Sequence, residues 1–158
     1  MTRVCLVGDD DVDLRFELLS RETARDALST YDLDQPYENT IALETVSIGT
    51  AVSLLNDLNW YLVRCTDAAW VREPSIDDQE WLSRELATAV RNDQIAPERT
   101  GQLLSIYGVE RESPADAGRL VEPLYVRRTD GTVPEYDLRD VDETVVVRVT
   151  ESEFEAGS

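Results

Sequence analysis

The sequence predicts a single-domain protein of the α/β or α+β class with a mixed β-sheet. Two patterns along the chain lead to this prediction. In the first half, short apolar runs alternate with stretches of helical periodicity, an order typical of βαβ units. The second half of the chain begins with one predicted helix, and runs of β-branched residues follow it. We therefore expect a β-rich C-terminal part, with this helix packed between it and the N-terminal part. A chain of 158 residues is long enough for one domain with its own core.

The first half contains five predicted elements. Residues 4–7 are apolar and predict a buried strand, and residues 41–46 predict a second one. Residues 13–31 fit a helix by length and composition, but their first positions also alternate as in a strand, so a strand followed by a helix stays open. Residues 51–58 carry apolar side chains at helical spacing. Residues 60–65 are aromatic and β-branched, and they predict a third strand.

A helix over residues 77–91 opens the second half. Its first turn is acidic, which is favourable at the positive end of the helix dipole. Asp77 and Glu80 have the spacing of a capping box, and Ile76 and Trp81 have that of a hydrophobic staple. These features together predict that the helix begins at residue 77.

The remaining chain is predicted to be mostly β-structure. Apolar and β-branched runs predict three strands, at residues 103–109, 124–128 and 144–150. Residues 129–132 (Thr-Asp-Gly-Thr) predict a tight turn, and residues 133–138 a short edge strand, because a proline there would not suit a central strand. We expect one domain over residues 1–151, followed by a flexible acidic tail at residues 152–158.

The charge of the chain is strongly negative. It has 33 acidic and 15 basic residues, a net charge of −18, and every basic residue is Arg, with no Lys and no His. Such a charge repels itself at low ionic strength, whereas at about 1 M salt the Debye length falls to about 3 Å and most of the repulsion is screened. Arg is also more weakly hydrated than an ammonium group and pairs with carboxylates through two hydrogen bonds.

This acidic, lysine-free composition resembles that of proteins from extremely halophilic archaea, in particular their small acidic proteins without an assigned function. The resemblance implies a cytoplasm with molar salt and says nothing about activity. An acidic protein from an ordinary cell is the alternative. The N-terminus has no signal-peptide core, and no apolar run reaches membrane-spanning length, so we expect a cytoplasmic protein without membrane partners.

Several kinds of chemistry are excluded by the residues that the sequence lacks. Without His there is no Ser-His-Asp triad, no Cys-His pair and no zinc site built on imidazole. Without Lys there is neither a Schiff base nor a phosphate-binding P-loop lysine. A GxGxxG dinucleotide fingerprint is also absent. The available chemistry is that of carboxylates, of Ser or Cys, and of Arg.

A cluster of acids follows the first predicted strand. Asp9, Asp10 and Asp11, together with Asp67 after residues 60–65, form a candidate site for Mg²⁺, a cation that prefers oxygen ligands. The segment resembles the acidic pocket of bacterial response-regulator receiver domains. That family also needs a Lys and a characteristic turn after a later strand, and this chain has neither, so receiver function is excluded. The alternative is a solvated loop that caps the next helix.

Four residues are candidates for contact with a partner. Trp70 lies between two predicted elements and outside any apolar stripe, so we expect it to be exposed. Arg127, Arg128 and Arg148 could bind an anion or RNA, although salt bridges to surface acids are the alternative role. The net negative charge disfavours nucleic acid without excluding it.

The sequence does not name an activity. The first hypothesis is a non-catalytic binding or regulatory module for a protein or small-ligand partner, with no cofactor. The alternative is a Mg²⁺-dependent enzyme that acts on a phosphorylated substrate through Asp9, Asp10 and Asp11. A third possibility is association with RNA or ribosomes.

Overall fold

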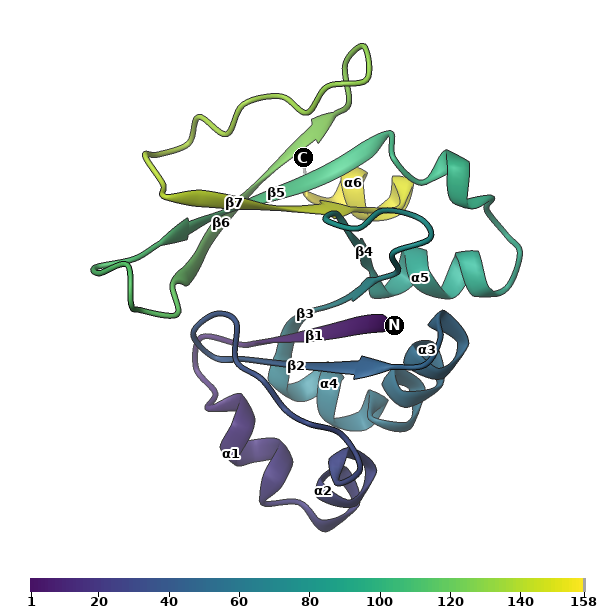
Figure 1. The fold of residues 1–158 in the computed structure, drawn as a ribbon, viewed down its shortest axis with the longest axis vertical. Coiled ribbons are helices and arrows are strands. Elements are labelled where there is room, and N and C mark those ends of the chain that lie inside the picture. The colour runs from purple at the N-terminus through teal and green to yellow at the C-terminus, as the bar shows by residue number, and fades with distance from the viewer. Residues whose placement is uncertain (158) are drawn as a thin grey trace.

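The computed structural model describes residues 1–157, which form a seven-stranded mixed sheet and six α-helices (Figure 1). In chain order the elements are β1 (Thr2–Gly8), α1 (Leu14–Leu19), α2 (Glu22–Leu28), β2 (Thr40–Thr45), α3 (Ile48–Asp57), α4 (Asn59–Cys65), β3 (Thr66–Arg72), β4 (Trp81–Ser83), α5 (Arg84–Arg91), the 3-10 helix η1 (Pro97–Arg99), β5 (Leu103–Glu110), β6 (Arg119–Arg127), β7 (Glu143–Arg148) and α6 (Glu151–Gly157). The predicted α+β class with a single domain and a mixed sheet is confirmed. Among these residues no helix is long and apolar enough to cross a membrane.

The strand order is β2-β1-β3-β4-β7-β5-β6. Strand β1 is antiparallel to both β2 and β3, so β2 and β3 run parallel to each other with β1 between them. This arrangement is a split βαβ unit, in keeping with the alternation of strands and helices in the first half. Strands β4 and β7 pair in parallel and join the two halves of the sheet, whereas the other pairings are antiparallel.

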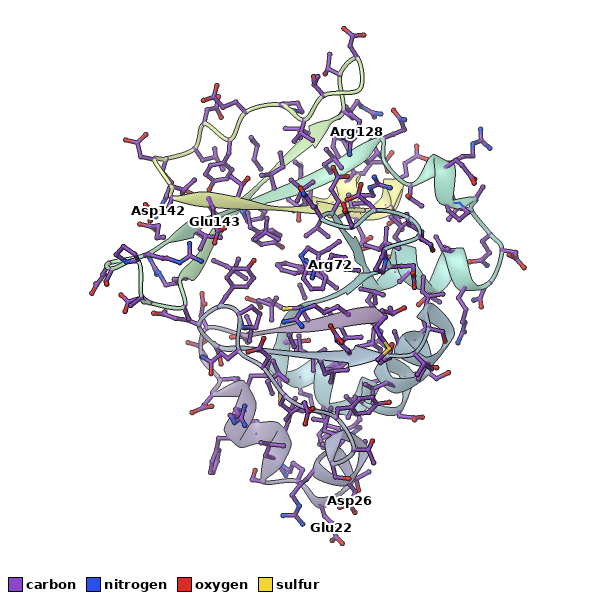
Figure 2. The ribbon with its side chains drawn as sticks, viewed as in Figure 1. Glu22, Asp26, Arg72, Arg128, Asp142 and Glu143 are labelled. Atoms are coloured by element: carbon purple, nitrogen blue, oxygen red, sulfur yellow. The ribbon has the colours of Figure 1, made fainter. Side chains whose placement is uncertain are left out.

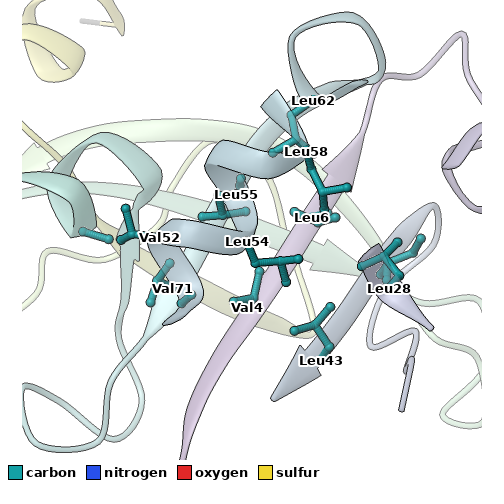
Figure 3. Packing of buried hydrophobic residues seen from close by; sticks show 14 of the residues in the cluster. Val4, Leu6, Leu28, Leu43, Val52, Leu54, Leu55, Leu58, Leu62 and Val71 are labelled. Carbon is teal, nitrogen blue, oxygen red and sulfur yellow. The ribbon is translucent and has the colours of Figure 1, made fainter. Parts of the chain in front are cut away.

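The two faces of β1 and β3 carry different cores because successive strand residues point to opposite sides. On one face, Val4, Leu6 and Val71 pack against helices α1–α5 in an aliphatic cluster (Figure 3). On the other face, Cys5 and Trp70 belong to a cluster that strands β5 and β7 cover. Figure 1 shows helices α1–α4 on one side of the first three strands and β5–β7 on the other.

Several predicted elements are confirmed. Residues 13–31 are helical as favoured, but they form two short helices, α1 and α2, in place of one; the side chain of Asp13 caps the first by accepting a hydrogen bond from Phe16 N. The turn at residues 129–132 has the expected pair of backbone hydrogen bonds between Thr129 and Thr132, with positive φ at Asp130 (51°) and Gly131 (77°). This is the backbone of a type I′ turn, which suits residues that tolerate positive φ.

The predicted strand at residues 60–65 is wrong, because these residues form helix α4. Leu58 and Leu62, one helical turn apart, are both buried, whereas Trp60 and Val63 are exposed. Burial of this leucine pair outweighs the β-propensity of the aromatic residues. The third strand is instead β3, which contains Trp70.

The predicted helix start at residue 77 is also wrong. Residues 81–83 form β4, and helix α5 begins at Arg84 with the Ser83 hydroxyl as its cap. The Asp77 carboxylate accepts hydrogen bonds from Gln79 N and Glu80 N in a turn before the strand. A side-chain cap therefore exists at Asp77, but it closes a turn and does not start a helix.

The C-terminal residues form a helix, contrary to the predicted flexible tail. Thr150 Oγ1 accepts a hydrogen bond from Glu153 N, and the Glu153 carboxylate accepts one from Thr150 N, which is a capping box at the start of α6. Phe154 packs against Tyr125, with 6.4 Å between ring centroids. Residue 158 lies outside the described residues. The edge strand expected at residues 133–138 is absent from the described chain, and there the Tyr136 hydroxyl donates to Glu122 O.

Candidate functional site

A cleft lies between the two halves of the sheet. One part, of about 690 Å³, is lined by residues of β3, β5 and α6 that include Trp70, Ser105 and Glu153. A second part, of about 990 Å³, extends along the loop after β1 toward β6. Both parts are lined by Asp67, Ala68 and Tyr107, so they meet at these residues. We call the two parts together the central cleft.

Alternation along β5 brings Ser105 to the cleft. Leu104 and Ile106 are buried on the opposite face of the strand, so Ser105 and Tyr107 share the face that lies toward Trp70. Ser105 is 2% exposed, and its Oγ is almost fully covered by neighbouring atoms. The polar group beside it is the hydroxyl of Tyr107. The two side chains therefore form a small polar pair in the wall of the cleft.

Tyr107 is held as a neutral phenol in the cleft. Its ring lies 5.1 Å from the Trp70 ring, centroid to centroid. Burial raises the pKa of Tyr107 to about 12; the nearby Tyr125, Asp67 and Glu153 add to the shift, and a hydrogen bond with the Ser105 side chain opposes it. At neutral pH its hydroxyl therefore keeps its proton and is available as a donor.

The carboxylate of Glu153, on α6, also lines the cleft. Its Oε1 accepts hydrogen bonds from Ser83 Oγ at 2.6 Å and from Thr150 Oγ1 at 3.0 Å. Ser83 is also the cap of α5, so this contact ties the C-terminal helix to the start of α5. Within the described chain no Arg forms a salt bridge with Glu153.

Asp67 stands where the two parts of the cleft meet. Its pKa is raised, first by desolvation and then by the neighbouring carboxylates Asp9, Asp10 and Asp11. No salt bridge to Asp67 occurs within residues 1–157. This exposed side chain therefore lies close to other carboxylates without a basic partner among the described residues.

We expect Asp67→Asn to raise the melting temperature slightly at neutral pH. A carboxyl whose pKa is raised on folding favours the folded state at pH below its unfolded pKa, and this contribution is lost as the pH rises through the folded pKa. The gain from the amide should therefore be largest at neutral pH and shrink in acid. Thermal melts of both proteins across this pH range measure it, with Asp26→Asn on α2 as the control (Figure 2). An equal gain at acidic and neutral pH would contradict the charge explanation.

The structure brings the predicted acidic residues together in part. Asp10, Asp11 and Asp67 all line the second part of the cleft, whereas the Asp9 carboxylate accepts a hydrogen bond from Asp11 N. In residues 1–157 no group of three or more His, Cys, Asp or Glu side chains is arranged to hold a metal ion. The Mg²⁺ site and the enzyme that would use it stay predictions from the sequence.

The four residues predicted to contact a partner do not form a free exposed surface. Trp70 is 2% exposed, so its expected exposure is wrong, and the exposed tryptophan is Trp60. Arg128 and Arg148 both donate to Glu80, which places them in salt bridges, and Arg127 lies over the Phe154 ring at 5.0 Å. All three arginines therefore already have intramolecular contacts.

Sequence reasoning missed Ser105, Tyr107 and Glu153. The run Leu-Leu-Ser-Ile-Tyr at residues 103–107 contains one signal, a small hydroxyl residue among large apolar ones in a predicted strand. The Thr150–Glu153 spacing of a capping box was a second signal, for α6. Neither pattern shows that the two segments face one cleft, because that depends on how β5 and α6 pack.

The fold and the cleft define a single-domain α+β protein with one continuous sheet and a cavity with polar and aromatic walls. Residues 2–109 match the model of a family of unknown function (DUF5804), and the chain belongs to this family. The matched span contains Asp67, Ser105 and Tyr107 and ends before Glu153. The comparisons with curated proteins and with solved structures found no match.

Proposed function

We propose that this protein is a non-catalytic binding module that holds a small polar ligand in the central cleft. The cleft itself carries the proposal, because its wall combines aromatic side chains with polar groups of Asp67, Ser105 and Glu153. A few polar groups along an aromatic wall can fix the orientation of a bound molecule.

The dimensions of the cleft support a small ligand over a protein partner. Ligand pockets usually measure about 300–1,000 Å³ and combine aromatic walls with a few polar groups. The part that contains Ser105 measures about 690 Å³ and has Trp70 and Tyr107 among its walls. Trp70, the residue expected to form a protein-binding surface, is buried in this wall.

The side chains at the cleft support binding over catalysis. With a pKa of about 12, Tyr107 does not act as a base at neutral pH. The Ser105 hydroxyl has no hydrogen bond to a base within the described residues, whereas a nucleophilic serine needs an adjacent one. A hydroxyl and a neutral phenol are well suited to recognise a ligand by hydrogen bonding.

The proposal places this binding module in a cytoplasm with molar salt. Its support is the net charge of −18 together with the use of Arg as the only basic residue. At about 1 M salt, long-range charge effects are screened beyond about 3 Å. Recognition at this salt concentration depends on short-range contacts.

The test is a ligand-observed NMR screen of small fragments in molar salt. Ala68, half-buried where the two parts of the cleft meet, is replaced by Phe to narrow the cavity, and Ala115→Phe in an exposed loop is the matched control. We expect fragments to bind the parent and the control and to lose binding to Ala68→Phe, with unchanged circular dichroism. Fragments that bind all three proteins equally would overturn the proposal.

A further inference from the structure

The inner wall of the central cleft is closed to solvent. Trp70 and Ser105 line the first part of the cleft, yet each is only 2% exposed. Their side chains are covered by neighbouring atoms, so a ligand can contact them only when a covering segment moves aside. The question is therefore which element around this wall can move.

Helix α6 is the most weakly held element around the inner wall. It supplies Glu153 to the lining of the cleft, and none of its residues Glu151–Gly157 is buried. Helices shorter than about 12 residues are marginal in water, so this seven-residue segment depends on its docking contacts to stay helical. Strands β3 and β5 and helix α5, which also line the cleft, contribute buried residues to a core. Among these elements α6 therefore opens at the lowest free energy.

Two side chains dock α6 onto the rest of the protein. The Glu153 carboxylate accepts a hydrogen bond from Ser83 Oγ at 2.6 Å. The Phe154 ring packs edge-on against Tyr125, another residue of the cleft lining, with 6.4 Å between the centroids. Gly157 also lies against the Tyr125 ring, where a Cβ atom would collide with it. The docked position is thus specific, although few side chains hold it.

Open space borders the segment that joins β7 to α6. Val149 and Thr150 line the central cleft, and together with Glu151 they line a separate cavity of about 530 Å³. Residues of α5 and η1 form other parts of that cavity wall. Figure 1 shows α6 beside β5, directly after β7. With a cavity on each side, the joining segment can rotate without displacing closely packed atoms.

We propose that α6 is a lid on the central cleft. The lid is closed when Glu153 is bound to Ser83 and Phe154 to Tyr125, and it opens by releasing both contacts and turning about residues 149–150. Opening uncovers the wall that contains Trp70 and Ser105 and admits the ligand. This inference rests on the proposed function, because it describes how a ligand reaches the same cavity.

The first measurement is acrylamide quenching of tryptophan fluorescence in molar salt. Trp60, which is 54% exposed, is replaced by Phe in every protein, so that the emission comes from the buried Trp70 and Trp81. In this background Phe154→Ala removes one docking contact, and Phe16→Ala, at a 65% exposed position on α1, is the matched control. We expect Phe154→Ala to raise the quenching constant about threefold or more and the control to leave it unchanged.

Hydrogen exchange followed by mass spectrometry separates opening of the lid from unfolding of the whole protein. Amides of α6 should exchange faster than those of β5, through a local opening that low concentrations of urea do not affect. Glu153→Ala should accelerate exchange in α6 alone, and Glu155→Ala, at an exposed position of the same helix, should not. Equal acceleration in α6 and β5 would mean that the variant destabilises the whole fold, and it would overturn the lid.

The outcomes distinguish the lid from the proposed function, because acrylamide needs no binding site. If Phe154→Ala and Phe16→Ala give the same quenching and the same exchange in α6, the lid is overturned. Binding of fragments to the parent and its loss in Ala68→Phe would still support the binding module. If α6 opens as expected but no fragment binds in an Ala68-dependent way, the proposed function is overturned, and with it the role of α6 in admitting a ligand.

Discussion

Transfer of the protein from molar salt into dilute buffer is expected to unfold it. The net charge of −18 is spread over one domain, and the Debye length grows from about 3 Å at 1 M to about 30 Å at 0.01 M salt. Repulsion among the surface carboxylates then acts across the whole molecule and opposes the compact state. The measurement is far-UV circular dichroism and thermal melting during stepwise dialysis, with the melting temperature falling as salt is removed.

The positions of the charges explain why the structure cannot offset this repulsion internally. Most of the 33 acidic residues form no salt bridge within the described chain. Glu22 and Asp26, for example, project from α2 at the end of the molecule farthest from the C-terminal half (Figure 2). Carboxylates of this kind repel one another without gaining a contact on folding.

Sucrose is the control for the salt experiment, since it favours compact states without screening charge. Sucrose in dilute buffer should restore less structure than potassium chloride of equal osmolarity. Replacement of exposed acids such as Glu22 and Asp26 by their amides should lower the salt concentration needed for folding. A full circular dichroism signal and a cooperative melt in dilute buffer would contradict the prediction, and with it the proposed high-salt setting.

The sequence predicted elements with a single clear pattern and failed where local propensity and burial disagree. Residues 51–58 have one apolar stripe, and they lie in α3 and the residue that caps it. Residues 60–65 have strong β-propensity, yet Leu58 and Leu62 hold them in a helix. Around Asp77 the predicted side-chain cap exists, but its hydrogen bonds to the backbone close a turn and do not start a helix.

The site was harder to predict than the fold. Asp67 was a candidate because acids near strand ends are visible in the sequence. Ser105 and Glu153 come from segments about 50 residues apart that meet only because β5, β7 and α6 pack together. The burial of Ser105 Oγ beside the Tyr107 side chain depends on its surroundings, and no pattern in one sequence reveals it.

Replacement of Glu80 by Ala is expected to lower the free energy of unfolding by about 3 kcal/mol, because it leaves the largely buried Arg128 without a carboxylate partner, whereas Arg148 keeps Asp77 at 3.5 Å. The Glu80 carboxylate accepts hydrogen bonds from both Arg128 and Arg148, and the three side chains are 15%, 16% and 13% exposed. Arg148 also donates to Thr100 Oγ1 at 2.9 Å. The network joins the loop before β4 to the ends of β6 and β7.

Urea unfolding in molar salt measures this effect, and Glu44→Ala is the matched control. Glu44 is 54% exposed, and its one salt bridge, to Arg3, is 4.0 Å long, so its loss should cost less than about 1 kcal/mol. Molar salt screens exposed pairs but acts weakly on buried ones, which widens the difference between the two variants. Equal stability of Glu80→Ala and Glu44→Ala would show that water and salt ions replace the carboxylate at Arg128 and Arg148. These arginines would then be available to an external anion, as the sequence first suggested.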